Sequence, residues 1–295
     1  MSGDQEITSE HPALTSVPGD ADVVACYAVR TDTGLVRDHN EDDFIVLPEH
    51  GVYLVADGMG GHNAGSIASR LCVEAVEDYF EERTPGENPS VEEPHDPDLP
   101  ASLLAANERI FQTSQTDATL HGMGTTVVGV RLQGQRLTVS HAGDSRVYLF
   151  RNGDLRRVTA DHSLSNFLRS IGRDAEANLA EATMSNVIMR ALGLEAAVEI
   201  ESNAVFVLPG DRILLCSDGL SDLVSEDAIS AVMMDVELRR WEAAEALVEL
   251  ALDEGGRDNI TVMIVDLYKE GHEPVDDDPA KHVPQRFEVA DDSME

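Results

Sequence analysis

Nine short apolar runs, each of strand length and rich in branched side chains, constrain the fold of this chain most strongly. The dipeptide Asn152-Gly153, between the run at 146–150 and the segment at 154–159, is typical of a tight type I′ turn and predicts a β-hairpin. We therefore expect mainly antiparallel strands. The runs lie at 23–29, 43–47, 52–56, 125–132, 136–142, 146–150, 204–208, 212–217 and 260–268.

Apolar residues spaced three and four apart predict helices between the strands. Two fall early, over about 67–80 and 103–111, where Leu103 and Leu104 belong to the apolar stripe. Two fall late, at about 226–237 and 240–253. This order lacks the strand–helix alternation of a parallel α/β sheet, so we predict an α+β fold in which helices cover antiparallel sheets.

Acidic residues and prolines are concentrated in three segments, 1–22, 81–100 and 269–295. These segments contain ten of the 12 prolines and about half of the formal net charge of −35. Such composition buries too little apolar surface to order itself. We therefore predict flexible acidic tails at 1–22 and 269–295, and one compact domain over 23–268 interrupted by an acidic proline-rich loop at 81–100.

The same charge argues against binding to nucleic acid or to an anionic membrane, because both would repel the chain. The sequence has no signal-peptide pattern and no apolar run of about 18 residues, the length that spans a bilayer. Cys26, Cys72 and Cys216 are widely separated and form no CxxC pair, which indicates buried thiols in a reducing compartment. We expect a cytoplasmic protein.

A second group of acids adjoins the apolar runs. Asp57 and Asp218 each follow one of these runs and precede a glycine, so we expect a strand that delivers a carboxylate at its end, then a sharp turn or a close backbone approach at the glycine. Asp144 lies between two runs, Asp258 lies before the last, and an acidic segment at 38–43 enters another. Each alone is more simply a turn-former or cap. Gathered together they would repel one another without a cation, and oxygen ligands favour magnesium or manganese.

Eight motifs in this order resemble those of the type 2C, metal-dependent Ser/Thr protein phosphatases, and most closely the bacterial minimal-domain branch. The resemblance covers about 23–268 and implies a four-layer α-β-β-α sandwich: two antiparallel sheets flanked by helix pairs. It also implies a small flap subdomain at about 161–193, whose middle departs from the family pattern. The motifs are GLVRDHNEDDF, LVADGMGGHNAG, GTTVVGV, HAGDSRVY, TADHS, MRALG, LLCSDGLSD and GGRDNITVMIVD.

The resemblance implies a site for two manganese or magnesium ions at one end of the sandwich. Asp57 would bridge both ions, and the Gly58 carbonyl would ligate one of them. Asp218 and Asp258 would complete the ligands of the other. Asp144 would join Asp218 in holding a possible third ion. A water between the metals would attack the phosphoryl group in line.

Other residues are implied to act beside the metals. Arg37 would grip the substrate phosphate, for which a guanidinium fork is suited. His62 is the candidate general acid that protonates the leaving oxygen. Asp42 and Glu41 would act largely through metal-bound waters, and Asn259 would orient its neighbour by hydrogen bonding.

Simpler readings stand beside these roles. His62 can be a helix cap, and Arg37 can be a surface ion-pair member. The remaining histidines near the motifs are expected to be structural: His39, His121, His141 on an apolar strand and His162 in a turn.

We predict a phosphoprotein phosphatase, a metal-binding signalling hydrolase of bacterial type. Its partners would be proteins phosphorylated on serine or threonine, including a cognate kinase, and the enzyme would be a monomer. Two alternatives share the fold: a regulatory phosphatase with one specific partner, and a pseudophosphatase that serves as a binding module. An acidic calcium-binding protein is disfavoured, since the run at 275–279 lacks the required loop pattern.

Overall fold

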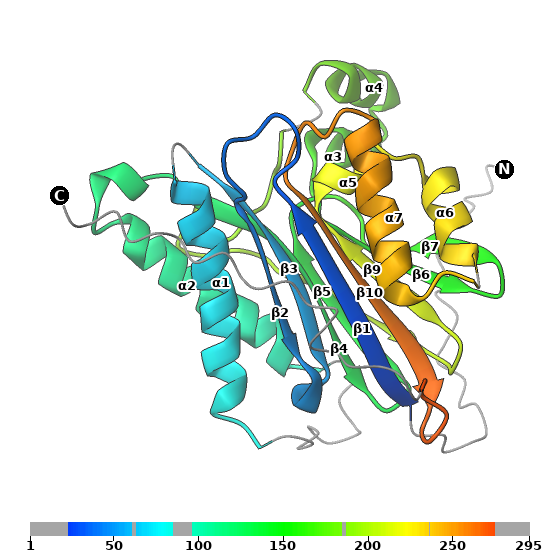
Figure 1. Cartoon of the computed structure of the whole chain (residues 1–295). Coiled ribbons are helices and arrows are strands. Elements are labelled where there is room, and N and C mark those ends of the chain that lie inside the picture. The colour runs from blue at the N-terminus through cyan, green and yellow to red at the C-terminus, as the bar shows by residue number, and fades with distance from the viewer. Residues whose placement is uncertain (1–22, 61–62, 85–95, 185–186, 236, 275–295) are drawn as a thin grey trace, which may run out of the picture.

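The computed structural model describes residues 23–60, 63–84, 96–184, 187–235 and 237–274. Two five-stranded antiparallel sheets stack face to face (Figure 1). The first sheet has the order β1 (Val23–Asp32), β10 (Ile260–Lys269), β9 (Arg212–Cys216), β6 (Arg146–Arg151) and β7 (Asp154–Arg157). The second has the order β2 (Asp42–Leu47), β3 (Val52–Met59), β4 (Gly124–Gln133), β5 (Arg136–Ala142) and β8 (Glu201–Phe206).

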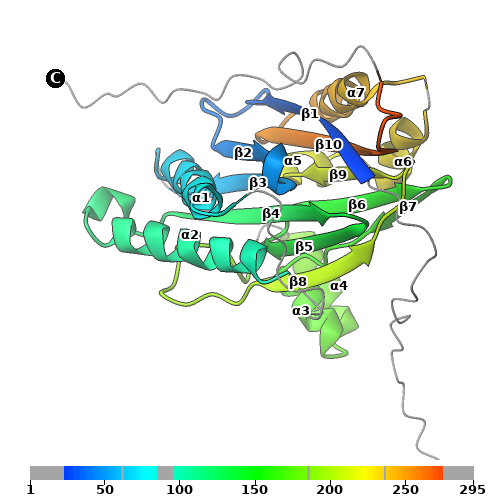
Figure 2. The ribbon, with the colours of Figure 1, turned by 90° about the horizontal axis from the view of Figure 1, so that it is seen from below.

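Helices cover the outer face of each sheet (Figure 2). The second sheet is covered by α1 (Ala64–Glu81) and α2 (Asp98–Ser114), and the first by α6 (Glu226–Met234) and α7 (Arg240–Asp253), with the short α5 (Asp218–Ser221) beside them. Three apolar cores result: one between the sheets, and one between each sheet and its helices. The predicted four-layer α+β sandwich is confirmed.

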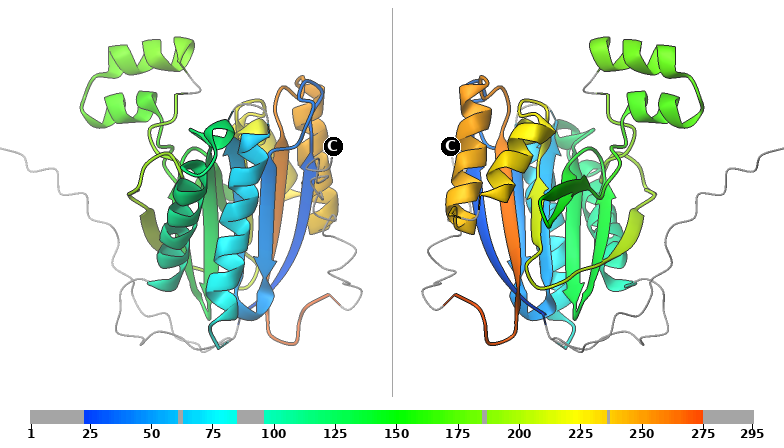
Figure 3. Two further views of the ribbon diagram at one scale, coloured as in Figure 1. Left: turned by 90° about the vertical axis from the view of Figure 1, so that its left-hand side faces the viewer. Right: turned by 90° about the vertical axis from the view of Figure 1, so that its right-hand side faces the viewer.

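A small subdomain projects from one end of the sandwich (Figure 3). It consists of α3 (Leu164–Ser170) and α4 (Asp174–Thr183), which pack on each other through a small apolar cluster of Leu164, Leu168, Ala177 and Ala180. It coincides with the predicted flap. The sequence did not predict its helices, because alanine supplies the buried positions of α4 and leaves only a weak apolar stripe.

Most predicted elements are present, and the tight turn is confirmed by positive φ angles of 52° at Asn152 and 86° at Gly153. Of the two alternatives expected after Asp57, the close backbone approach is present, since a Cβ on Gly58 would lie 2.2 Å from the carbonyl oxygen of Gly65. The sharp turn is not formed: β3 continues through Asp57 to Met59, because Asp57 and the residue after it keep their ladder pairing with β4. Leu104 does not face the core as expected and is 48% exposed.

The predicted tail 1–22 lies outside the described residues, as do residues 275–295 of the predicted tail 269–295 and residues 85–95 of the predicted loop. Lys269, the first residue of the second predicted tail, is the last residue of β10. The ends of that loop belong to the fold: α1 continues to Glu81 and α2 begins at Asp98. Asp96 is buried, and its Oδ1 accepts a hydrogen bond of 2.8 Å from Arg131 Nη1. The acidic segment is therefore anchored at its second end, where the composition predicts a loop.

Candidate active site

The site is built around a cross-strand pair of carboxylates. Asp42 of β2 lies directly opposite Asp57 of β3 in the ladder register. Asp42 Oδ2 accepts hydrogen bonds from Ser217 Oγ at 2.8 Å and Thr261 Oγ1 at 2.7 Å. Ser217 follows β9 and Thr261 belongs to β10, so this buried carboxylate joins the two sheets. Its Oδ1 is buried and has no hydrogen-bond partner among the described residues.

Asp218 reaches the same place from the first sheet. It is the first residue of α5 and is separated from β9 by Ser217 alone, so this strand leads into a short helix. The close backbone approach expected at the following glycine is present. The first turn of α5 packs tightly against the chain before β10, because a Cβ on Gly219 would lie 1.9 Å from the carbonyl oxygen of Asn259. Only glycine allows this approach, which brings Asp218 towards Asp258.

The carboxylates influence one another strongly. Burial raises the pKa of Asp57 well above its ordinary value, and the nearby charges of Asp218, Asp42, Asp144 and Asp258 raise it further. Burial likewise raises the pKa of Asp218 well above its ordinary value, with Asp144 as the largest charge contribution. The structure therefore brings together all five predicted aspartates.

Asp144 lies in the turn between β5 and β6, as predicted. Burial raises its pKa to about 6, helped by two acids that the sequence analysis did not single out, Asp161 and Asp222. Both belong to quoted motifs, TADHS and LLCSDGLSD, so the motifs were the available signal. Asp161 is already paired, because Arg146 donates to it from Nε at 3.0 Å and from Nη2 at 2.7 Å. Asp144 Oδ1, by contrast, is buried with no partner among the described residues.

Arg37 lies at the exposed side of the acidic cluster. Its Nη2 donates a hydrogen bond of 2.6 Å to Asp258 Oδ2, and the two side chains are 47% and 35% exposed. The arginine therefore combines access to solvent with direct contact to the cluster.

Asn259 fixes the loop that carries Arg37. Its Oδ1 accepts a hydrogen bond of 2.8 Å from the Glu41 amide, and its Nδ2 donates to the carbonyls of Thr33 and His39 at 2.9 Å each. The side chain thus supports the loop between β1 and β2. The contact expected between Asn259 and Asp258 is made by the backbone: the Asn259 amide donates to Asp258 Oδ1 at 2.9 Å.

Two further predicted residues lie on β3 and before β2. Gly58 is buried in β3, and its amide donates to the carbonyl of Glu41 at 3.1 Å. The Glu41 carboxylate lies at the start of α1, where the backbone of Ser66 hydrogen-bonds to it, but burial leaves its pKa raised. His62, the predicted general acid, lies outside the described residues.

The donor set fits a hard divalent cation. Two buried carboxylate oxygens, on Asp42 and Asp144, have no hydrogen-bond partner among the described residues. The surrounding donors are carboxylates that burial and mutual repulsion destabilise in their charged form. Oxygen-only ligands of this kind are those that magnesium and manganese prefer.

A family model, Protein phosphatase 2C, matches residues 35–253. The chain belongs to the protein phosphatase 2C family. It is 35% identical over 249 residues to the serine/threonine phosphatase Stp of Listeria monocytogenes, covering 83% of this chain and 97% of Stp. The crystal structure of the Mycobacterium tuberculosis serine/threonine phosphatase PstP is similar with a TM-score of 0.74 and 38% identity, covering 83% and 99% of the two chains.

A second similar structure, of a relative, contains metal ions. The catalytic domain of PstP in complex with two manganese ions matches with a TM-score of 0.71 and 37% identity, over 84% of this chain and 100% of that domain. The predicted family, fold and enzyme class are thereby confirmed: this protein phosphatase 2C is a phosphoprotein phosphatase. Within the described ranges, no helix is long and apolar enough to cross a membrane.

Proposed function

We propose that this phosphatase hydrolyses phosphoserine and phosphothreonine in proteins, using two manganese or magnesium ions held by the aspartate cluster. The observation that carries the proposal is the pairing of Asp42 with Asp57 across two strands, beside Asp218, with Arg37 at the exposed side. Stp and PstP are both named serine/threonine phosphatases, and PstP binds manganese, which supports the same chemistry here.

In this proposal the side chains divide the work of holding the cations. Asp57, the Gly58 carbonyl, Asp218 and Asp258 would hold two ions, and Asp144 with Asp218 would hold a possible third. When bound, the cations supply an activated water nucleophile and neutralise charge on the phosphoryl group.

Asp42 and Glu41 would act largely through waters bound to the ions. Asp42 is held by Ser217 and Thr261, so its orientation is fixed before any ligand arrives.

Arg37 binds the substrate phosphate. A guanidinium presents several N–H donors in one plane, which suits the oxygens of a phosphate monoester. The Asn259 contacts to the loop place this guanidinium over the cluster. His62 remains our candidate for protonating the leaving serine or threonine oxygen.

The proposed substrates are phosphorylated proteins, including a cognate Ser/Thr kinase, met by a monomeric enzyme in the cytoplasm. The catalytic domain would extend over 23–268, with acidic tails at 1–22 and 269–295. The net charge of −35 disfavours nucleic acid as a partner. A silent binding module is disfavoured because all the carboxylates needed for metal binding are in place.

The test is hydrolysis of p-nitrophenyl phosphate and of a phosphothreonine peptide by the full chain, with manganese, with magnesium and with excess chelator. Asp57→Asn and Asp218→Asn should abolish activity, and the chelator should do the same. Asp154→Asn is the matched control, since it removes one carboxylate from the exposed hairpin after β6. Full activity of either site variant would exclude the proposed mechanism.

A further inference from the structure

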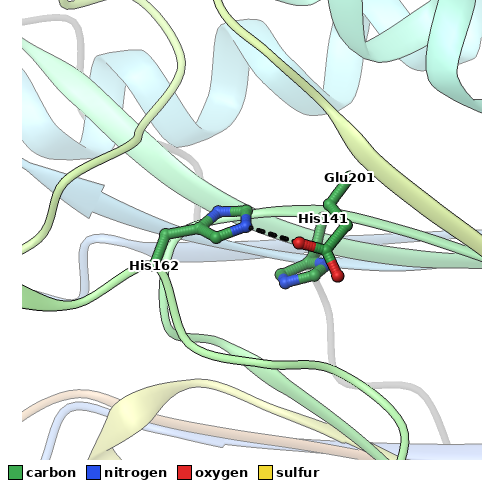
Figure 4. A group of neighbouring side chains, drawn as sticks. All are labelled: His141, His162 and Glu201. Carbon is green, nitrogen blue, oxygen red and sulfur yellow. Dashed lines mark hydrogen bonds and ion pairs between the residues drawn. The ribbon is translucent and has the colours of Figure 1, made fainter. Parts of the chain in front are cut away.

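His162, where the flap leaves the body of the protein, is a centre of hydrogen bonds. Its ring Nδ1 accepts from the Gly143 amide at 3.2 Å, and its own amide donates to the Gly143 carbonyl at 2.9 Å. Its Nε2 lies 3.2 Å from Glu201 Oε2 at the start of β8 (Figure 4). The ring also stacks on His141 of β5, with centroids 4.5 Å apart. One side chain thus contacts three segments of the chain.

The same residue closes the stem of the flap. The Met189 amide donates to the His162 carbonyl at 2.6 Å, and Ser163 forms an isolated β-bridge with Ile188. Beyond the stem, α3 and α4 pack mainly on each other. The position of the flap therefore depends on the contacts of its stem. The backbone of His162 belongs to the stem, and its side chain contacts the body of the protein.

His141, His162 and Glu201 offer possible ligand atoms within 4.8 Å of one another, but their geometry does not favour a metal ion. The two rings are nearly parallel, at 13°, so their in-plane lone pairs cannot point at one ion. His141 Nε2 lies 2.8 Å from the Ala160 carbonyl, which fixes it as an N–H donor. Arg190 Nη1, a cation, lies 3.3 Å from His162 Nε2.

The contacts to Gly143 and Glu201 together favour one tautomer of His162. Because a backbone amide can only donate, its contact assigns the lone pair to Nδ1, and Nε2 then carries the hydrogen that faces Glu201. Arg190 Nη1, which is also a donor, then lies 3.3 Å from Nε2 as a neighbouring cation and not as a hydrogen-bond partner. A proton on Nδ1 would face the Gly143 amide. In agreement, burial lowers the pKa of His162, and the neighbouring His141 lowers it further.

Gly143 has little freedom of its own. Its φ of +121° is in the region that favours glycine, and a Cβ there would lie 2.4 Å from Thr126 Cβ. The next residue is Asp144, so a hydrogen bond that fixes the Gly143 amide also restrains the position of Asp144 in the acidic cluster.

We propose that His162 is a positioning residue, whose Nδ1 acceptor couples the stem of the flap to the turn that carries Asp144. The part of this inference that is tested by enzyme activity rests on the proposed phosphatase function. The stem has a second, independent anchor in the Asp161–Arg146 pair, so loss of the imidazole should loosen the stem and leave the fold intact.

Two matched variants distinguish loss of the Nδ1 acceptor from loss of the rest of the imidazole ring. In His162→Asn, the side-chain oxygen can take the place of Nδ1, whereas in His162→Gln the amide reaches the place of Nε2 and leaves the Gly143 amide without its acceptor. With manganese, we expect His162→Asn to stay within about threefold of the parent in kcat/KM for a phosphothreonine peptide, since its acceptor is kept. His162→Gln should lose about tenfold, mainly through KM. Equal values for the two variants would overturn the proposal.

Two measurements test the coupling without activity. Nitrogen NMR of the imidazole in the parent protein should show an unprotonated Nδ1 and a protonated Nε2. Hydrogen exchange at the Gly143 amide should be about tenfold faster in His162→Gln than in His162→Asn. The opposite tautomer, or equal exchange, would exclude the proposed contact. If the parent protein is inactive but shows the expected tautomer and the expected difference in exchange, the phosphatase function is excluded and the positioning role is still supported.

Discussion

Arg37 donates a hydrogen bond of 2.6 Å to Asp258, joining the residue proposed to bind phosphate to a proposed metal ligand. Both side chains are partly exposed, at 47% and 35%, and ion pairs in such positions contribute at most about 1 kcal/mol. A phosphate in a bidentate contact offers the guanidinium a stronger partner. Arg37 can therefore leave Asp258 when substrate enters, at little cost.

Replacement of Arg37 should separate substrate binding from metal binding. Arg37→Ala removes charge-assisted hydrogen bonds worth about 1.5–3 kcal/mol, so KM for p-nitrophenyl phosphate should rise by about tenfold to a hundredfold. Because the contact to Asp258 is weak, manganese affinity measured by calorimetry should change by less than about fivefold. Arg37→Lys keeps the charge but loses the fork, and should lie between. An unchanged KM in Arg37→Ala would contradict the assigned role.

The metal-free protein should become less stable as pH rises. Burial raises the pKa of Asp42 and of Asp144 to about 6, above the ordinary value of 3.8. A raised pKa means that the folded state binds more protons, so this contribution is present at low pH and is lost as pH rises from about 4 through 6. Each group accounts for up to about 3 kcal/mol.

Urea unfolding in chelator should therefore give a lower free energy of unfolding at about pH 7.5 than at about pH 5. Asp144→Asn should reduce the difference, and added manganese should restore stability at the higher pH by binding the folded state. Asp154→Asn, at the exposed hairpin, should leave the difference as it is. Greater stability of the metal-free protein at the higher pH would contradict the proposed burial of these carboxylates.

Most strands could be predicted because each is a short apolar run that carries its own signal, as β9 and β10 show. β7 has no such run, and only the hairpin dipeptide before it indicated a strand. The motifs likewise pointed to Asp57, Asp144 and Asp218, since family resemblance assigns positions directly. The path of β3 beyond Asp57 could not be predicted, because Asp-Gly also forms turns and only the pairing with β4 keeps this one extended.

Contacts between distant segments were also beyond the sequence. His162 looked like a turn residue, and nothing local indicates that its ring meets Gly143, His141 and Glu201. Asp161 lies within the TADHS motif, but its pairing with Arg146 depends on how the segment after β7 lies beside β6. Such networks arise from tertiary packing and leave no periodic pattern in the chain.

A buried ion network at the other end of the sandwich should govern stability without affecting chemistry. Arg131 Nη1 lies 2.8 Å from both Asp96 Oδ1 and Asp98 Oδ2, and its side chain is 5% exposed. β4 places it opposite Val52, at the far end of β3 from Asp57. Removing one partner of such a network leaves buried charge uncompensated, which costs about 3–5 kcal/mol.

Arg131→Met should therefore lower the free energy of unfolding by about 3–5 kcal/mol, measured by urea titration with manganese present. Below the unfolding transition, kcat and KM for p-nitrophenyl phosphate should match the parent. Asp78→Asn is the control, because it removes an exposed ion pair with Arg109 and should cost less than about 1 kcal/mol. If the two variants are equally stable, the network does not anchor the start of α2.

Asn259 offers the sharpest test of how the loop proposed to bind phosphate is held. Its side chain makes three hydrogen bonds, to the Glu41 amide and to the carbonyls of Thr33 and His39, and is 4% exposed. Asn259→Ala leaves all three groups without this partner. We expect a loss of about 1–3 kcal/mol in stability and a rise of about tenfold in KM for p-nitrophenyl phosphate, because the loop carries Arg37.

Asn259→Asp distinguishes the hydrogen bond that this side chain accepts from the two that it donates. The carboxylate can still accept from the Glu41 amide, but it cannot donate to the two carbonyls, and it adds a charge beside Asp258. Its KM should therefore rise as in Asn259→Ala. In the double variant, Arg37→Ala with Asn259→Ala, the fold increase in KM should be clearly smaller than the product of the two single-variant increases. Both substitutions act through the same guanidinium. Fully multiplicative effects would show that Asn259 acts on the reaction by another route than the placement of Arg37.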